Sequence, residues 1–376
     1  MIPFCQSTNS HKSLQYVTEA INSKRICGDN RFTKKCHTWF KNYLGVDCLL
    51  TTSCTHALEM AAILCEIKEG DEVIMPSYTF VSTANAFVMR GAKIIFVDIR
   101  PDTMNIDENL IEPAITKRTK AIVPVHYAGV ACEMDKIMQI AKKYNLFVIE
   151  DAAQAMTSAY NGQKLGTIGD FGCFSFHETK NFSMGEGGLL IINNRKFIKR
   201  AEIIREKGTN RSQFFRGEID KYSWIDIGSS YLPSDINAAY LYGQLEECKQ
   251  IIEERLKIWD NYYKLLLTLK DSNDIELQTI STECKHNAHM FYIKVRDLKT
   301  RNNLIKFLRE HKIYTVFHYI PLHTSSACKK FGKFSGDDIF TTKESERILR
   351  LPFYQNLEQE KINFTCNQII NFFRKK

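Results

Sequence analysis

The sequence predicts an α/β protein with a mostly parallel sheet, in which a large domain is followed by a smaller C-terminal α/β domain. Three observations carry this prediction. The chain has 376 residues, and short apolar runs alternate with helix-like stretches between residues 50 and 190. After residue 235, this alternation gives way to a long helical stretch. Continuous β-branched runs separated by helices are typical of parallel strands covered on both faces. A chain of this length has room for one large and one smaller domain.

Five apolar runs are the expected strands of the large sheet. They are 71–75, 93–98, 121–125, 146–149 and 189–192. Amphipathic stretches such as 133–144 lie between them and are expected to be helices. Ligands of such sheets bind beyond the carboxyl ends of the strands, so chemically active side chains are expected there.

A long helical stretch from Asp235 to about Lys270 is expected to link the two domains, because its apolar residues recur at helical spacing. The smaller domain is expected to contain a strand at 290–295 and a helix at 301–310. The predicted division is therefore 1–249 for the large domain with its N-terminal segment, and 250–376 for the linking helix and the small domain.

Composition indicates an ordinary soluble globular protein, with 44% hydrophobic and 25% charged residues. No apolar run reaches the roughly 18–20 residues that cross a bilayer. Residues 1–6 lack the basic-then-apolar pattern of a signal peptide. We therefore expect a cytoplasmic protein that does not bind membranes.

Neither the cysteines nor the histidines have the spacing of a metal site. None of the twelve cysteines forms a C-x-x-C pair, which favours free thiols in a reducing compartment. The pairs His286/His289 and His318/His323 lack a nearby set of carboxylates or thiolates, so no metal is expected.

The net charge of +8 is spread along the chain. A modest basic bias attracts anionic small molecules such as a nucleotide diphosphate. Nucleic-acid binding is not expected, because it would require a clustered basic patch or a module signature.

Two polar residues follow expected strands at the edge where ligands bind. Asp151 comes directly after the run 146–149, where a carboxylate can hold a cofactor ring nitrogen in its protonated form. Lys180 ends a polar turn after the run 174–176, and a lysine that forms a Schiff base needs a fixed backbone and a site that favours its neutral form. Taken alone, Asp151 could cap a helix and Lys180 could be a solvated surface charge.

A phosphate site and a stacking aromatic precede these two residues. Ser53, Cys54 and Thr55 lie just before the helix-forming stretch 57–66, where free N–H groups and hydroxyls suit a phosphate, although simple N-capping explains the same pattern. Phe80 lies in a loop after a strand and could stack on a flat cofactor or pack in the core.

The order of these signals, with the lysine 29 positions after the aspartate, resembles the fold-type I pyridoxal-phosphate enzymes. Within them, the chain is similar to the DegT/DnrJ/EryC1/StrS sugar aminotransferases over nearly its whole length. The resemblance is closest in the segments 70–83, 125–129, 150–154 and 174–181.

The resemblance implies a pyridoxal 5′-phosphate cofactor and a role for each matching residue. Lys180 matches the Schiff-base lysine, and Asp151 matches the partner of the pyridine nitrogen. Further matches are Gln154 near the cofactor hydroxyl, Phe80 as the stacking ring, and Ser53, Cys54, Thr55 and Ser175 around the phosphate. Ser230 falls where many relatives place an Asn that reaches the phosphate of the neighbouring subunit, which implies a homodimer with shared active sites.

The segments 205–217 and 226–232 resemble family members that serve enterobacterial common antigen synthesis. This likeness implies conversion of dTDP-4-dehydro-6-deoxy-D-glucose to dTDP-4-amino-4,6-dideoxy-D-galactose, with L-glutamate as amino donor. Arg211 is then expected to pair with pyrophosphate oxygens and His318 to approach the sugar or nucleotide, although either can be a surface contact.

Three alternative functions compete with this prediction. A nucleotide-sugar 4-aminotransferase could give the gluco epimer instead. A non-catalytic regulatory protein could use the same scaffold, because a fold alone does not guarantee activity. A sugar dehydratase of this family would carry histidine in place of Lys180, so the lysine argues against it.

Overall fold

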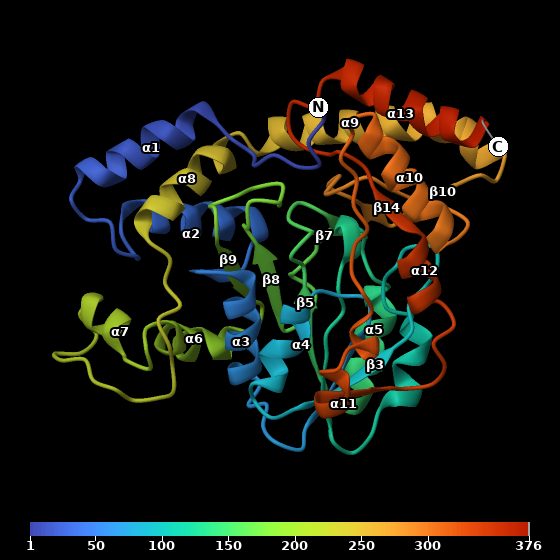
Figure 1. Cartoon of the computed structure of the whole chain (residues 1–376). Helices are drawn as coiled ribbons and strands as arrows, with labels where there is room; N and C mark the ends of the chain where they lie inside the picture. The colour runs from blue at the N-terminus through green and yellow to red at the C-terminus, as the bar shows by residue number, and fades with distance from the viewer. Residues whose placement is uncertain (375–376) are drawn as a thin grey trace.

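The computed structural model describes residues 1–374 and confirms the predicted α/β class (Figure 1). Its centre is an eight-stranded sheet with strand order β1-β9-β8-β5-β4-β2-β3-β13. The bounds are β1 Asp47–Thr51, β2 Glu72–Pro76, β3 Lys93–Val97, β4 Thr119–Ile122, β5 Phe147–Asp151, β8 Phe171–Ser175, β9 Gly188–Ile192 and β13 Gly332–Phe334.

The sheet is mostly parallel, as predicted. Strand β9 alone runs antiparallel to its neighbours β1 and β8, whereas the other pairs are parallel. The polar turn after β8 therefore leads back into the sheet through β9, and the carboxyl ends of β5 and β8 lie side by side.

Helices cover both faces of the large sheet. Alternate strand residues such as Val73 and Ile74 point to opposite faces, so the strands β1 to β5, β8 and β9 contribute to two separate apolar clusters. One face packs against α2 Arg31–Leu44, α5 Met134–Tyr144 and α8 Asp235–Glu246, and the other against α3 Cys54–Leu64, α4 Val81–Val88 and α6 Ile198–Arg205. Helix α1 His11–Asn22 packs on α8, and α7 Arg211–Phe215 projects from the body beside α6 (Figure 1).

A second, three-stranded sheet carries the C-terminal part of the chain. Its strands are β10 Glu276–Leu277, β12 Tyr292–Lys294 and β14 Ile348–Arg350, in the order β10-β12-β14. The helices α9 Cys248–Asp271, α10 Leu298–Glu310 and α13 Gln359–Arg374 pack on it around one apolar cluster. The remaining α-helices and strands are α11 Cys328–Phe331, α12 Thr341–Arg347 and a small sheet of β6 Ala159–Tyr160, β7 Gln163–Lys164 and β11 Cys284–Lys285.

Two local expectations differ from the structure. The helical stretch predicted over 235–270 is two helices, because Glu247 leaves helical geometry with φ −101° and ψ 13° and separates α8 from α9. The strand expected at 121–125 ends at Ile122, and Pro124, which has no N–H to donate to a neighbouring strand, follows it.

The division at residue 249 stays a prediction, and several contacts cross it, among them the pairing of β11 with β6. Strand β13 extends the large sheet beside β3, and Ile2 forms a β-bridge with Ile313 of the C-terminal part. Within residues 1–374, no helix is long and apolar enough to span a bilayer. All twelve cysteines are free.

Candidate active site

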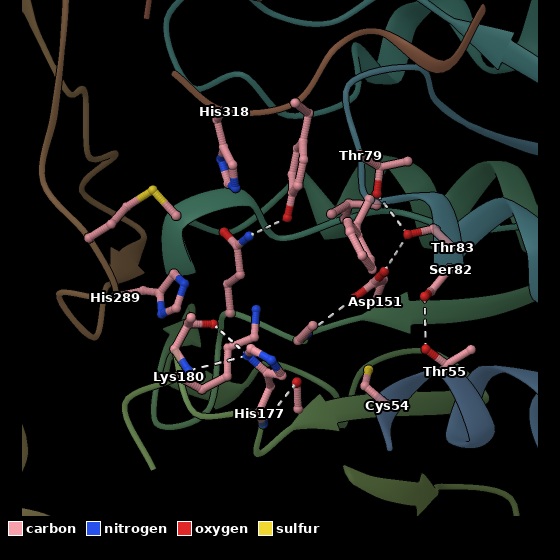
Figure 2. A pocket seen from close by; sticks show the side chains of 18 of the residues that line it. Cys54, Thr55, Thr79, Ser82, Thr83, Asp151, His177, Lys180, His289 and His318 are labelled. Atoms are coloured by element: carbon pink, nitrogen blue, oxygen red, sulfur yellow. Dashed lines mark hydrogen bonds between the residues drawn. The ribbon is translucent and has the colours of Figure 1, made fainter. Parts of the chain in front are cut away.

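A cavity of about 640 Å³ opens at the carboxyl ends of β5 and β8 (Figure 2). Nine of the residues expected at the site line it: Ser53, Cys54, Thr55, Phe80, Asp151, Gln154, Ser175, Lys180 and His318. They come from the first turn of α3, the start of α4, the ends of β5 and β8, and a loop of the C-terminal part. The fold thus brings together segments that are far apart in the sequence.

Lys180 lies in the turn after β8, and its backbone N–H donates to the carbonyl of His177 at 2.9 Å. Burial lowers the pKa of the Lys180 ammonium below its ordinary value, which the nearby Cys54 and Asp151 partly oppose. A partly buried lysine of this kind loses its proton more readily than a surface lysine and becomes a nucleophile.

Asp151 is the last residue of β5, and both of its carboxylate oxygens accept a hydrogen bond. The hydroxyl of Thr83 donates to Oδ2 at 2.7 Å, and the N–H of Ala153 donates to Oδ1 at 3.1 Å. No helix begins directly after Asp151, so its carboxylate does not act as a helix cap. Burial raises the pKa of its carboxyl group, although these hydrogen bonds act in the opposite direction. A cationic partner in the cavity would favour the ionised form.

The first turn of α3 has the geometry of an anion site. Ser53 is its N-cap, and its hydroxyl accepts from the N–H of His56 at 3.1 Å, so the capping interpretation is correct for this side chain. The amides of Cys54 and Thr55 come next, where no intrahelical carbonyl can accept from them. Such free N–H groups at a helix start bind phosphate.

Gly188 lets strand β9 approach this turn closely. A Cβ atom at residue 188 would lie 2.4 Å from the nitrogen of Cys54 and 2.5 Å from the carbonyl oxygen of Ser53. Any other residue would displace the start of α3. Burial also raises the pKa of the Cys54 thiol well above its ordinary value, so this cysteine stays protonated and is a poor nucleophile.

Aromatic and amide side chains form the wall above Lys180. The ring of Phe80 is 54% exposed and its centroid lies 6.1 Å from that of Tyr319, so Phe80 faces the cavity and does not fill the core. Gln154 accepts from the N–H of Ala128 at 2.6 Å and donates to the hydroxyl of Tyr319 at 2.9 Å. His318 stacks on Tyr319 with ring centroids 3.7 Å apart.

Several lining residues were missed by the sequence analysis. Thr83 follows Thr79 by four positions, so that one helical turn could have brought the two hydroxyls together; they lie 2.7 Å apart. Tyr319 directly follows the predicted His318. Arg350 lies in a short apolar stretch far along the chain, and no motif marks it.

Arg211 and Ser230 do not reach this cavity within one chain. They line a second cavity of about 830 Å³, beside Asp29, Lys34 and Glu206. Arg211 Nη1 lies 3.8 Å from Glu206, and the guanidinium stands 5.0 Å from the ring centroid of Phe215. A role in the first cavity would therefore require a neighbouring chain.

Comparisons with known proteins agree with this geometry. The DegT/DnrJ/EryC1/StrS aminotransferase family matches residues 7–370. GDP-perosamine synthase of Escherichia coli O157:H7 is 32% identical over 100% of this chain and 99% of its own. The UDP-4-amino-4-deoxy-L-arabinose–oxoglutarate aminotransferase of Shewanella sediminis is 30% identical and covers 98% of each chain.

Among solved structures, the putative sugar aminotransferase Spr1654 from Streptococcus pneumoniae in its PLP-form has a TM-score of 0.89 and 26% identity. The match covers 100% of this chain and 99% of that one. The expected fold-type I architecture and the expected family are thus confirmed. The finer likeness to enzymes of a dTDP-linked galacto sugar is not shown by these relatives and stays a prediction.

Proposed function

Because the chain belongs to the DegT/DnrJ/EryC1/StrS aminotransferase family, we propose that it converts dTDP-4-dehydro-6-deoxy-D-glucose to dTDP-4-amino-4,6-dideoxy-D-galactose with L-glutamate as amino donor. The observation that carries the aminotransferase activity is the meeting of Lys180, Asp151 and the free amides of α3 in one cavity. The choice of sugar rests on the sequence likeness of 205–217 and 226–232, since the relatives compared above are named for GDP- and UDP-linked sugars.

The cofactor is pyridoxal 5′-phosphate, and the residues of the cavity fit it. When bound, this cofactor acts as an electron sink that stabilises a carbanion at the carbon bearing the amino group. The amides of Cys54 and Thr55, with the hydroxyl of Ser175, would hold its phosphate, and Phe80 would stack on its ring. Asp151 retains lone pairs for the ring nitrogen, because each of its oxygens accepts only one hydrogen bond in the structure.

Lys180 has two roles in this proposal. Its side chain is the attachment point of the cofactor, and after displacement by the donor it moves a proton at the glutamate Cα. In the second half of the cycle, it delivers a proton to C4 of the sugar. Lys180 reaches its substrate from one side only, so the sugar face turned toward it decides between the galacto and gluco products.

We further propose a homodimer in which the partner chain completes each site. Arg211 and Ser230 line a cavity of their own in the single chain. Large apolar side chains follow on the same projecting segment: Phe215, Tyr222, Trp224, Ile225 and Ile227 are 68%, 50%, 82%, 52% and 45% exposed. Exposed apolar clusters of this kind mark interaction surfaces, and a two-fold dimer would cover them.

The product itself tests the proposed function. With dTDP-4-dehydro-6-deoxyglucose and glutamate, we expect a 4-amino sugar whose proton NMR spectrum shows a small H3–H4 coupling, because the amine is axial. A large diaxial coupling would identify the gluco epimer and reject the galacto assignment. A purified protein with no cofactor absorbance and no amine transfer would instead support the non-catalytic alternative.

Replacing Arg211 by alanine tests the second cavity. We expect a rise of about tenfold or more in the KM for the sugar nucleotide and a change below twofold in the KM for glutamate, because a guanidinium that pairs with pyrophosphate contacts only one substrate. Mixing this variant with Lys180→Ala should restore activity if Arg211 acts across the dimer, since one site of each mixed dimer is then intact. Equal changes in both KM values would remove Arg211 from this role.

A further inference from the structure

Two buried threonines form a chain of hydroxyl groups that ends on Asp151 (Figure 2). Thr79 lies in the loop after β2, and Thr83 lies in the first turn of α4. Their hydroxyl oxygens are 2.7 Å apart, and the Thr83 hydroxyl donates to Oδ2 of Asp151 at 2.7 Å. Because both threonines are shielded from bulk solvent, their hydroxyls depend on one another and on Asp151 for hydrogen bonds.

Helix capping does not explain these two hydroxyls. A threonine near the start of a helix commonly accepts from a free backbone N–H group. The N-cap of α4 is Phe80, which has no side-chain capping bond within residues 1–374. Thr79 and Thr83 bond instead to each other and to Asp151. Their hydroxyls therefore serve the carboxylate at the end of β5.

The chemistry of the groups fixes the direction of the chain. A threonine hydroxyl has one hydrogen to donate, and an ionised carboxylate can only accept. Thr83 gives its hydrogen to Asp151, so its oxygen accepts from Thr79. Each bond in such a chain polarises the next, and a hydrogen bond to an ionised acceptor is stronger than one to a neutral acceptor. The chain therefore favours the ionised form of Asp151, which burial disfavours.

The titratable groups that face Asp151 cannot replace this chain. They are Cys54 of α3, His126 after β4, Cys173 of β8, Lys180 in the turn after β8, and Tyr319. Burial raises the pKa of both thiols and of the Tyr319 phenol, so these groups stay neutral. Nδ1 of His126 accepts from the N–H of Cys132 at 3.1 Å, which leaves no place for a second proton on this ring. Lys180 changes its protonation state in the proposed cycle, whereas the threonine hydroxyls do not.

We propose that Thr83, with Thr79 behind it, is a positioning residue that holds Asp151 ionised and oriented for the ring nitrogen of the cofactor. This role rests on the part that Asp151 has in the proposed function. The Thr83 hydroxyl on Oδ2 and the N–H of Ala153 on Oδ1 fix the carboxylate from both sides. The remaining lone pairs then keep one direction in the cavity, as a preorganised electrostatic contact requires.

Unfolding of the cofactor-free protein tests the charge that the chain supports. Thr83→Val keeps the shape of the side chain and removes the hydroxyl. Because the lost bond is stronger for an ionised acceptor, we expect the fall in Tm to be larger by about 2 °C or more at about pH 8 than at about pH 4. The pKa of Asp151 lies above its ordinary value of 3.8 and rises further without the Thr83 donor, so the extra loss appears as pH rises through this pKa.

The Asp151→Asn background separates this effect from a general loss of packing. In that background, the pH-dependent part of the Thr83→Val effect should disappear, because no carboxylate remains to ionise. Thr365→Val is the matched control, since the buried Thr365 hydroxyl in α13 donates to the carbonyl of Lys361 at 2.8 Å, and its loss should lower Tm equally at both pH values. A Thr83→Val loss that is equal at both pH values, or that keeps its pH dependence in Asp151→Asn, would overturn the proposal.

Affinity for pyridoxal 5′-phosphate gives a second readout. We expect Thr83→Val to weaken binding by about tenfold, the scale of one charge-assisted hydrogen bond, and Thr79→Val to weaken it less. Thr83→Ser keeps a hydroxyl and should stay within about threefold of the wild type in affinity. Affinity unchanged in Thr83→Val, or lost equally in Thr83→Ser, would reject the role of Thr83. Should Thr83→Val fail to fold, Thr83→Ala and Thr79→Val test the same chain. A wild-type protein that binds no cofactor would reject the proposed function, while the cofactor-free unfolding would still decide whether Thr83 holds Asp151 ionised.

Discussion

Lys180→Ala is expected to lower turnover by about 10⁴-fold or more, the upper range for a positioned acid–base group. The variant loses both the covalent anchor of the cofactor and the amine that moves the proton. It should still bind pyridoxal phosphate through the first turn of α3, so the protein would keep a cofactor that borohydride no longer fixes to the chain.

Single-turnover kinetics measure this loss in each half-reaction separately. Lys249→Ala serves as the matched control, because the Lys249 side chain is 91% exposed and should be dispensable. A small primary amine such as methylamine should restore part of the rate, since it can enter the space of the missing side chain and move the proton. Turnover of Lys180→Ala near the wild-type rate would show that another base acts in the cavity.

Asp151→Asn is expected to lower the rate of the glutamate half-reaction by at least about 100-fold, the scale of losing one strong electrostatic contact. Asparagine keeps the size of the side chain and can accept from Ala153, while the hydroxyl of Thr83 can turn to accept from the new amide. It has no negative charge to hold a protonated ring nitrogen. Asp260→Asn, at an exposed position of α9, is the control. A change below threefold would remove Asp151 from this role.

In the cofactor-free protein, Asp151→Asn should leave the folded state at least as stable as in the wild type, although it lowers the reaction rate. Burial raises the pKa of Asp151 above its ordinary value of 3.8, so its contribution to folding is complete at lower pH and is lost as pH rises through the folded-state pKa. Asp151→Asn removes the carboxyl group whose ionisation burial disfavours. Thermal unfolding of the cofactor-free variant should therefore occur at the same temperature as the wild type or higher, which separates a loss of chemistry from a loss of folding.

The predictable part of the fold came from local patterns. Apolar runs such as 93–98 mark strands because parallel strands are buried on both faces, and the polar residues that follow two of these runs proved to share one cavity. The break at Glu247 was missed because apolar spacing continues across it. The pairing of β13 with β3 was missed because three residues carry too little pattern to identify a strand.

At the site, too, only the residues with a recognisable local sequence pattern could be predicted. Asp151 and Lys180 stand in recognisable surroundings, namely a strand end and a polar turn. Arg350 lines the same cavity only because tertiary contacts bring the end of β14 there, and the spacing of residues along the chain does not encode those contacts. For Arg211 and Ser230, the sequence likeness points to the active site, but within a single chain both residues line the second cavity.

Locating the attached cofactor tests most directly whether Lys180 anchors it. The purified protein would be reduced with borohydride, digested and mapped by mass spectrometry, before and after incubation with L-glutamate. We predict a cofactor adduct on the peptide that contains Lys180, and its disappearance after glutamate because the donor displaces the lysine. An adduct on a different lysine, or one that glutamate leaves unchanged, would show that Lys180 is not the attachment point that the donor displaces.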